Sequence, residues 1–105
     1  MCGIIGYVGK QKALPIILDG LRNMEYRGYD SGGVAIAESG RTIKTLKSVG
    51  PLLNLEEKIS KHNFKGLAGI GHVRWATHGG VTEKNSHPHT DCNQKIWVVH
   101  NGIVE

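Results

Sequence analysis

With 105 residues, of which 39% are hydrophobic and 21% charged, the chain is long enough for one globular domain with a modest core. Its formal charge of +4 comes from scattered basic residues, and only 6% of the residues are aromatic, which argues against a nucleic-acid partner. There is no signal-peptide pattern and no apolar stretch near the roughly 18 residues of a membrane-spanning helix, which predicts a cytoplasmic protein without a membrane partner.

The chain begins with Met1-Cys2-Gly3, and removal of Met1 would leave Cys2 with both a thiol and a free α-amine. A terminal α-amine titrates close to neutral pH, so it can take a proton from the neighbouring thiol without any burial to tune it. An ordinary buried cysteine is the alternative interpretation. Cys92 is the second cysteine, and we expect both thiols to be free in a reducing compartment.

A strand, a helix and a hairpin are predicted in the first half of the chain. The apolar, β-branched run 2–9 is typical of a buried strand. Apolar residues at three- and four-residue spacings predict an amphipathic helix over 14–24. A turn-rich loop over 27–33 follows, and the segments 34–37 and 42–46 are expected to pair as a hairpin.

A second helix and two further strands are predicted in the second half. Pro51 opens the helix over 52–59, with acidic residues early and a lysine late, in accord with the helix dipole. The run 67–75 predicts a strand with Arg74 near its end, and the last predicted strand is 96–100. A guanidinium at a strand end can grip a ligand carboxylate with two hydrogen bonds, although a surface ion pair explains it equally well.

Two residues after the last predicted strand suggest acyl-transfer chemistry. The amide of Asn101 and the backbone N–H of Gly102 are suited to stabilise an oxyanion. An ordinary Asn-Gly turn accounts for the same pair, so this sequence alone leaves both interpretations open.

His87, His89 and Cys92 form a rival set, because these residue types bind metals. Further histidines lie nearby in the sequence at positions 72, 78 and 100. The spacing matches no zinc-binding pattern, so we expect no metal site and assign these histidines to packing or to hydrogen bonds in loops.

Four blocks of the sequence together resemble the class II glutamine amidotransferases, which are N-terminal-nucleophile hydrolases. The blocks are residues 2–7, 25–31, 71–79 and 100–102. Within that class, the Arg-Gly-Tyr-Asp loop, the Arg-Trp-Ala-Thr-His-Gly run and the His-Pro-His loop resemble the members that act on fructose 6-phosphate. The resemblance implies an α+β fold, a four-layer αββα sandwich of two antiparallel sheets, and no cofactor.

The resemblance also implies roles for individual residues. Cys2 would be the nucleophile with its own amine as base, and Asn101 with Gly102 would form the oxyanion hole. Arg74 would hold the carboxylate of glutamine. The other assigned residues are Trp75, Thr77 and His78 lining the glutamine loop, His87 beside the site, and Arg27 near Cys2 but one layer further from the substrate.

The implied reaction is attack on the side-chain amide of glutamine, formation of a γ-glutamyl thioester, release of ammonia and hydrolysis to glutamate. In the full-length enzyme, which is expected to be a homo-oligomer, fructose 6-phosphate would accept the ammonia. Residues 1–105 are expected to be the N-terminal part of a glutaminase domain, inactive or weakly active without the rest. A metal-binding module and a catalytically silent regulatory domain are the competing hypotheses.

Overall fold

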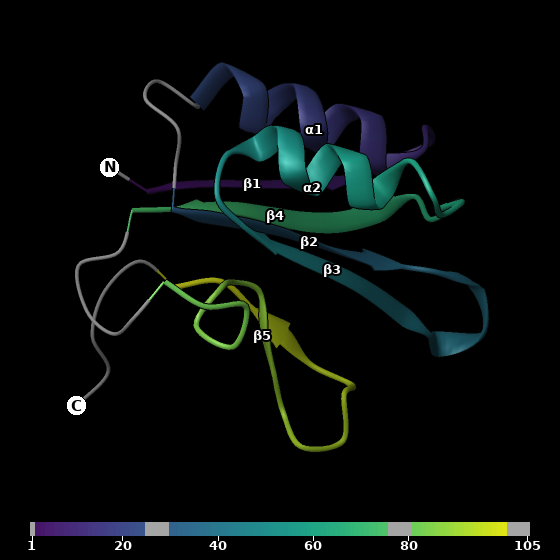
Figure 1. The fold of residues 1–105 in the computed structure, drawn as a ribbon. Helices are drawn as coiled ribbons and strands as arrows, with labels where there is room; N and C mark the ends of the chain where they lie inside the picture. Colours follow the sequence, from purple (N-terminus) through teal and green to yellow (C-terminus); the bar gives the residue numbers. More distant parts are fainter. Residues whose placement is uncertain (1, 25–29, 76–80, 101–105) are drawn as a thin grey trace.

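The computed structural model describes residues 2–24, 30–75 and 81–100. Two helices and four long strands make up most of this part of the chain (Figure 1). In order, the elements are β1 (Gly3–Val8), α1 (Ala13–Met24), β2 (Ser31–Ala37), the 3₁₀ turn Ser39–Arg41, β3 (Ile43–Val49), α2 (Leu52–Ile59), β4 (Ala68–Arg74), β5 (His89–Thr90) and β6 (Trp97–Val98).

The four long strands form one antiparallel sheet in the order β1-β4-β2-β3. β4 is the last of them in the sequence, yet it lies between β1 and β2 and pairs with both. Its register places Val73 opposite Gly3 and Arg74 opposite Ser31. The start of β1, the start of β2 and the end of β4 therefore meet at one end of the sheet.

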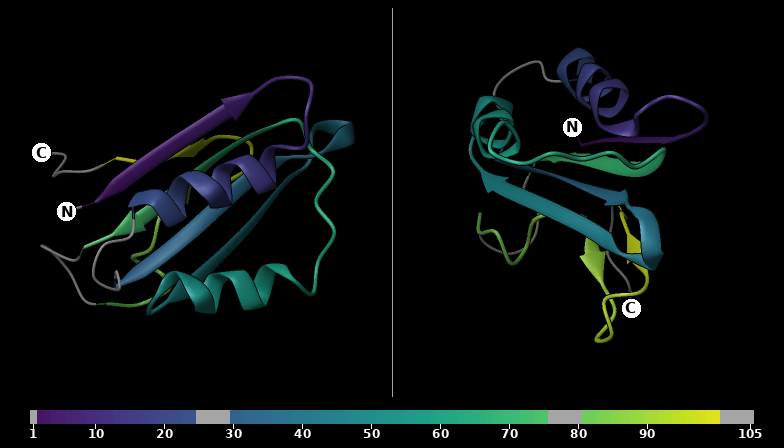
Figure 2. Two further views of the ribbon diagram at one scale, coloured as in Figure 1. Left: turned by 90° about the horizontal axis from the view of Figure 1, so that it is seen from above. Right: turned by 90° about the vertical axis from the view of Figure 1, so that its right-hand side faces the viewer.

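Both helices cover one face of this sheet (Figures 1 and 2). Each helix buries the side of its surface that its apolar spacing predicts. Gly71 of β4 allows α1 to approach the sheet, because a Cβ there would lie 2.5 Å from Cγ2 of Ile17. The resulting core consists of Ala13, Leu14, Ile17, Leu18, Leu21, Val34, Ile36, Leu52, Leu55, Ile59, Phe64 and Val73.

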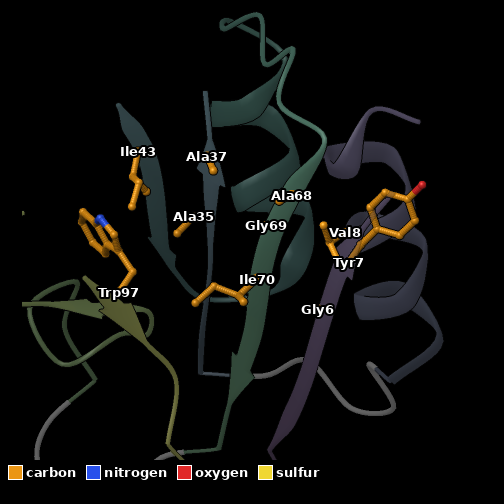
Figure 3. Close-up of a pocket in the computed structure, with 10 residues that line it drawn as sticks. All are labelled: Gly6, Tyr7, Val8, Ala35, Ala37, Ile43, Ala68, Gly69, Ile70 and Trp97. Carbon is orange, nitrogen blue, oxygen red and sulfur yellow. The ribbon is translucent and has the colours of Figure 1, made fainter. Parts of the chain in front are cut away.

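The other face of the sheet is partly covered by the segment 81–100, which includes the β5–β6 hairpin (Figure 2). Between the hairpin and the sheet lies an apolar cavity of about 460 Å³. Figure 3 shows Trp97 of the hairpin at one side of this cavity and Ile43, Ala35 and Ile70 of the sheet around it. The order of layers is thus helices, large sheet and small sheet.

The predicted α+β class and the antiparallel sheet are confirmed, and this layer order is consistent with an N-terminal-nucleophile hydrolase. No helix within the described ranges is long and apolar enough to cross a membrane. Both helices and the strands predicted at 2–9, 34–37, 42–46 and 67–75 form close to their expected bounds.

The predicted loop over 27–33 is wrong at its end, because β2 already begins at Ser31. Its glycines at positions 32 and 33 pair with β3 on one side and β4 on the other. An interior strand gains ladder hydrogen bonds along both edges, and these override the weak strand preference of glycine. Turn-like composition is therefore a poor guide where a sheet encloses the segment.

The strand predicted over 96–100 is also shorter in the structure, where only Trp97 and Val98 pair with β5. The backbone N–H groups of Lys95 and Ile96 donate to the Asp91 carboxylate at 2.8 and 2.9 Å. These two hydrogen bonds lower the pKa of Asp91, and the one from Ile96 has the larger effect. Asp91 thus closes the hairpin turn and binds the N–H of Ile96, the first residue of the predicted strand.

The position of Leu55 in the core gives a prediction about stability. We expect Leu55→Ala to lower the free energy of unfolding by about 2–5 kcal/mol, because the fully buried side chain would leave a cavity. Leu53, on the same helix and 60% exposed, is the matched control, and its replacement by alanine should have little effect. Urea denaturation followed by circular dichroism measures both, and equal losses would contradict the packing described above.

Candidate active site

The thiol of Cys2 lies against the backbone of Trp75, immediately beyond β4. The N–H of Trp75 donates to Sγ at 3.3 Å, and Sγ lies 3.5 Å from the carbonyl oxygen of the same residue. Continuing the β1–β4 register by one residue places Cys2 opposite Arg74. The start of the chain is therefore held at the carboxyl end of a central strand, where a side chain is well positioned for chemistry.

Gly3 allows the end of α1 to pack close to the start of β1. A Cβ at Gly3 would lie 2.8 Å from Sδ of Met24 and 3.2 Å from Cγ2 of Val73, so any larger residue would have to push the helix end away. Because Gly3 faces the helices, the alternation of a strand directs Cys2 to the opposite face of the sheet. The thiol thus lies on the face that carries Arg74.

Arg74 is 8% exposed and lies in register with Ser31 of β2. Its carbonyl oxygen accepts a 2.9 Å hydrogen bond from the N–H of Asp30, which fixes the end of β4 to the start of β2. The guanidinium is therefore carried by a strand that is paired on both sides. Such a rigid base suits a group that has to hold a ligand carboxylate in one orientation.

His72 lies two residues before Arg74, so strand alternation places both on the same face. His72 is only 1% exposed, and its ring centroid lies 4.3 Å from that of His87. The ring of His87 also lies 4.3 Å from that of His89 in β5. We call these three residues the histidine column, which joins β4 to the segment on the open face.

The environment of the histidine column is basic and partly shielded from water. Burial lowers the pKa of His87 to about 4, and it also lowers the pKa of His89. Electrostatic interactions with His72, His89, Arg74 and Lys47 lower the pKa of His87 further, because each of these groups is a cation or becomes one on protonation. His87 is therefore neutral at pH 7.

A lysine of α2 attaches the start of the same segment to the edge of the sheet. The ammonium of Lys58 donates to the carbonyl oxygen of Lys47 at 2.8 Å and pairs with the carboxylate of Glu83. Behind Glu83, the hydroxyl of Ser86 donates to the carbonyl oxygen of Thr82 at 2.9 Å, which closes a compact turn. The segment that carries His87 is thus also attached to the outer strand β3.

The structure brings four of the predicted site residues into one region. Cys2, Arg74 and Trp75 lie together where β1 meets the end of β4. His87 packs its ring on that of His72, which is on the same face of the sheet as Arg74. Trp75 is 44% exposed, so its side chain is accessible. The remaining predictions lie outside the described residues, and they concern Arg27, Thr77, His78, Asn101 and Gly102.

The rival set of metal ligands does not assemble within the described residues, where no three His, Cys, Asp or Glu side chains are arranged to hold a metal ion. Cys92 is exposed in the connection between β5 and β6. The sequence assigned His72 to packing or to loop hydrogen bonds, but it did not predict that His72 lies beside His87. Its spacing of two residues from Arg74 was the available signal, since it implies a shared face.

Comparison with known proteins finds relatives of this chain, although no family model matches it. The chain is 57% identical over 105 residues to glutamine–fructose-6-phosphate aminotransferase (isomerizing) of Clostridium tetani. It is 53% identical over 104 residues to the protein of that name in Methanococcus maripaludis and 54% over 106 residues to that of Streptomyces coelicolor. In each case the match covers 99–100% of this chain and 17% of the relative. With this identity along its whole length, the chain belongs to the family of the glutamine–fructose-6-phosphate aminotransferases.

Proposed function

We propose that this chain carries the residues that cleave the side-chain amide of glutamine, with Cys2 as the nucleophile. The observation that supports this most directly is the position of the Cys2 thiol, hydrogen-bonded to the backbone of Trp75 and in register with Arg74. The pairing of β1 with β4 provides a nucleophile and a cationic group for the substrate on one rigid sheet. The names of the relatives identify glutamine and fructose 6-phosphate as what those proteins act on.

In the proposed reaction, removal of Met1 frees the α-amine of Cys2, which takes the proton of the thiol. The bond from Sγ to the amide carbon forms, the carbon–nitrogen bond breaks, and the nitrogen leaves as ammonia with the transferred proton. Water then cleaves the thioester, which releases glutamate and restores the thiol. Asn101 and Gly102, proposed from the family resemblance, would stabilise the oxyanion of each tetrahedral intermediate.

The proposal assigns the α-carboxylate of glutamine to Arg74. A buried guanidinium at a strand end offers paired donors that match a carboxylate. Trp75, Thr77 and His78 would line the glutamine, His87 would lie beside it, and Arg27 would support Cys2. In the complete protein, ammonia would pass to fructose 6-phosphate for amino sugar synthesis, and this proposal includes a cytoplasmic homo-oligomer without a nucleic-acid partner.

The nucleophile is tested by Cys2→Ala in the full-length protein. We expect glutamine hydrolysis to fall to the background rate, because no other group on the chain would form the thioester. A glutamine-like electrophile should label Cys2 and leave Cys92 unlabelled, and Cys92→Ala serves as the control with full activity. Labelling of Cys92 in place of Cys2 would contradict the assignment. Activity with free ammonia but none with glutamine in the unaltered protein would favour a silent domain.

The role of Arg74 is tested by Arg74→Ala. Because the carboxylate lies away from the reacting amide, its contact is equally strong in the ground and transition states, so KM should rise and kcat should change little. Loss of a charge-assisted hydrogen bond predicts an increase in KM of about ten- to a hundredfold. Arg41→Ala is the control, since Arg41 lies in the β2–β3 connection at the other end of the sheet. A change in kcat alone would refute carboxylate binding.

A further inference from the structure

We propose that His72 is a positioning residue for glutamine binding, which holds the loop around His87 against the Arg74 side of the sheet without touching the substrate itself. The proposal rests on the proposed glutaminase function. It concerns a residue that has no role in that chemistry, and it explains why a histidine rather than an aliphatic residue occupies a buried strand position.

The first argument comes from the register of the sheet. Ile4, His72, Gly33 and Lys47 form one row across all four strands, on the face opposite the helices. Gly33 leaves a gap in this row, and the backbone of the His87 loop fills it. A Cβ at Gly33 would overlap the carbonyl oxygen of His87 and lie 3.0 Å from its carbonyl carbon and 3.1 Å from Cδ of Pro88. The loop therefore packs directly on the backbone of β2.

The second argument concerns what fixes the ring of His87. Its buried Nδ1 has no hydrogen-bond partner among the described residues. Its neighbours are the ring of His72 on one side and the ring of His89 on the other, each with a centroid distance of 4.3 Å. Ring packing, rather than hydrogen bonding, thus orients His87, and His72 is the partner that the sheet holds in place.

Burial, and then the positive charges nearby, keep the His87 ring of this contact neutral by lowering its pKa. The groups that face His87 are His72 on β4, His89 on β5, and the cations Arg74 and Lys47 on β4 and β3. Glu83 is the acidic group nearby, and it acts on Lys47. Because the pKa of His87 is about 4 in the folded chain, an unfolded chain binds more protons between about pH 6.5 and pH 4. The packing is at full strength above that window and weakens as the pH falls through it.

The third argument connects the histidine column to the site. Arg74, which is two residues from His72 on the same strand face, lies opposite Cys2. From His87 the chain continues through the hairpin to His100, the residue before Asn101. Release of His87 would therefore move the loop around His87 on the Arg74 face of the sheet. It would also disturb the segment that leads to Asn101 of the proposed oxyanion hole.

The contact is tested with three variants of the full-length protein, His72→Ala, His72→Gln and His72→Phe. We expect His72→Ala to raise the KM for glutamine about two- to tenfold, the range given by loss of one aromatic pair, with a smaller change in kcat. His72→Phe keeps a ring at this position and should restore a KM near that of the unaltered protein, whereas His72→Gln should not. Rates are referred to the concentration of thiols labelled by a glutamine-like electrophile, so that misfolded protein is not counted.

A second test leaves His72 intact and displaces the His87 loop by a substitution at Gly33 in β2. Gly33→Ala should raise KM as His72→Ala does, because the methyl group displaces the carbonyl of His87. Gly32→Ala is the matched control on the helix face of the same strand. Its Cβ would lie 3.4–3.6 Å from its neighbours, which is ordinary contact, so KM should not change.

Hydrogen exchange over residues 81–90 separates this proposal from the proposed function. Faster exchange in His72→Ala and Gly33→Ala, but not in His72→Phe or Gly32→Ala, is expected whether or not glutamine is hydrolysed. An unaltered KM in both His72→Ala and Gly33→Ala, in a protein that Cys2→Ala inactivates, would overturn the positioning role and leave the glutaminase function standing. If the unaltered protein lacks glutaminase activity, the proposed function fails. In that case the rate of hydrogen exchange over residues 81–90 decides whether His72 holds the loop. A rate that is unchanged in His72→Ala would refute the contact.

Discussion

The pairing of β1 with β4 is the constraint on which the rest of this structure depends. The register that sets Gly3 opposite Val73 brings the first residues of the chain beside a strand that begins more than sixty residues later. Ladder hydrogen bonds make this placement rigid, and a slip of one residue would turn Cys2 toward the helices. The proposed nucleophile and the proposed carboxylate-binding arginine therefore owe their proximity to one pairing of strands.

Small residues on both faces of the sheet make the neighbouring layers possible. On the helix side, Gly71 and Gly3 allow α1 to lie close to β4 and β1. On the other side, Gly33 allows the backbone of the His87 loop to rest on β2. Gly3, Gly33 and Gly71 thus serve as contact points between layers, which explains why these glycines occur within strands.

The histidine column connects the packing of the layers to the chemistry at their edge. His72 is held by the sheet, and His87 is held by His72. Burial, and then the charges of Arg74 and Lys47, disfavour protonation of His87 in these surroundings. Buried imidazoles with depressed pKa values commonly occur near functional sites, because the same burial and charge that shift them also serve substrate binding. A contact between neutral aromatic rings can fix the His87 loop next to the cationic Arg74 without removing the positive charge of the guanidinium.

The sequence by itself determined the elements and the chemistry of single residues. Local apolar spacing predicted helices over 14–24 and 52–59, close to the observed α1 and α2, and the motifs around Cys2 and Arg74 indicated the family. Only the tertiary structure decided that β4 lies beside β1 and that Ser31 begins a strand. It also decided that His72 packs on His87. The reason is that hydrophobic periodicity is a local property, whereas pairing, register and the gap at Gly33 arise from residues far apart in the chain.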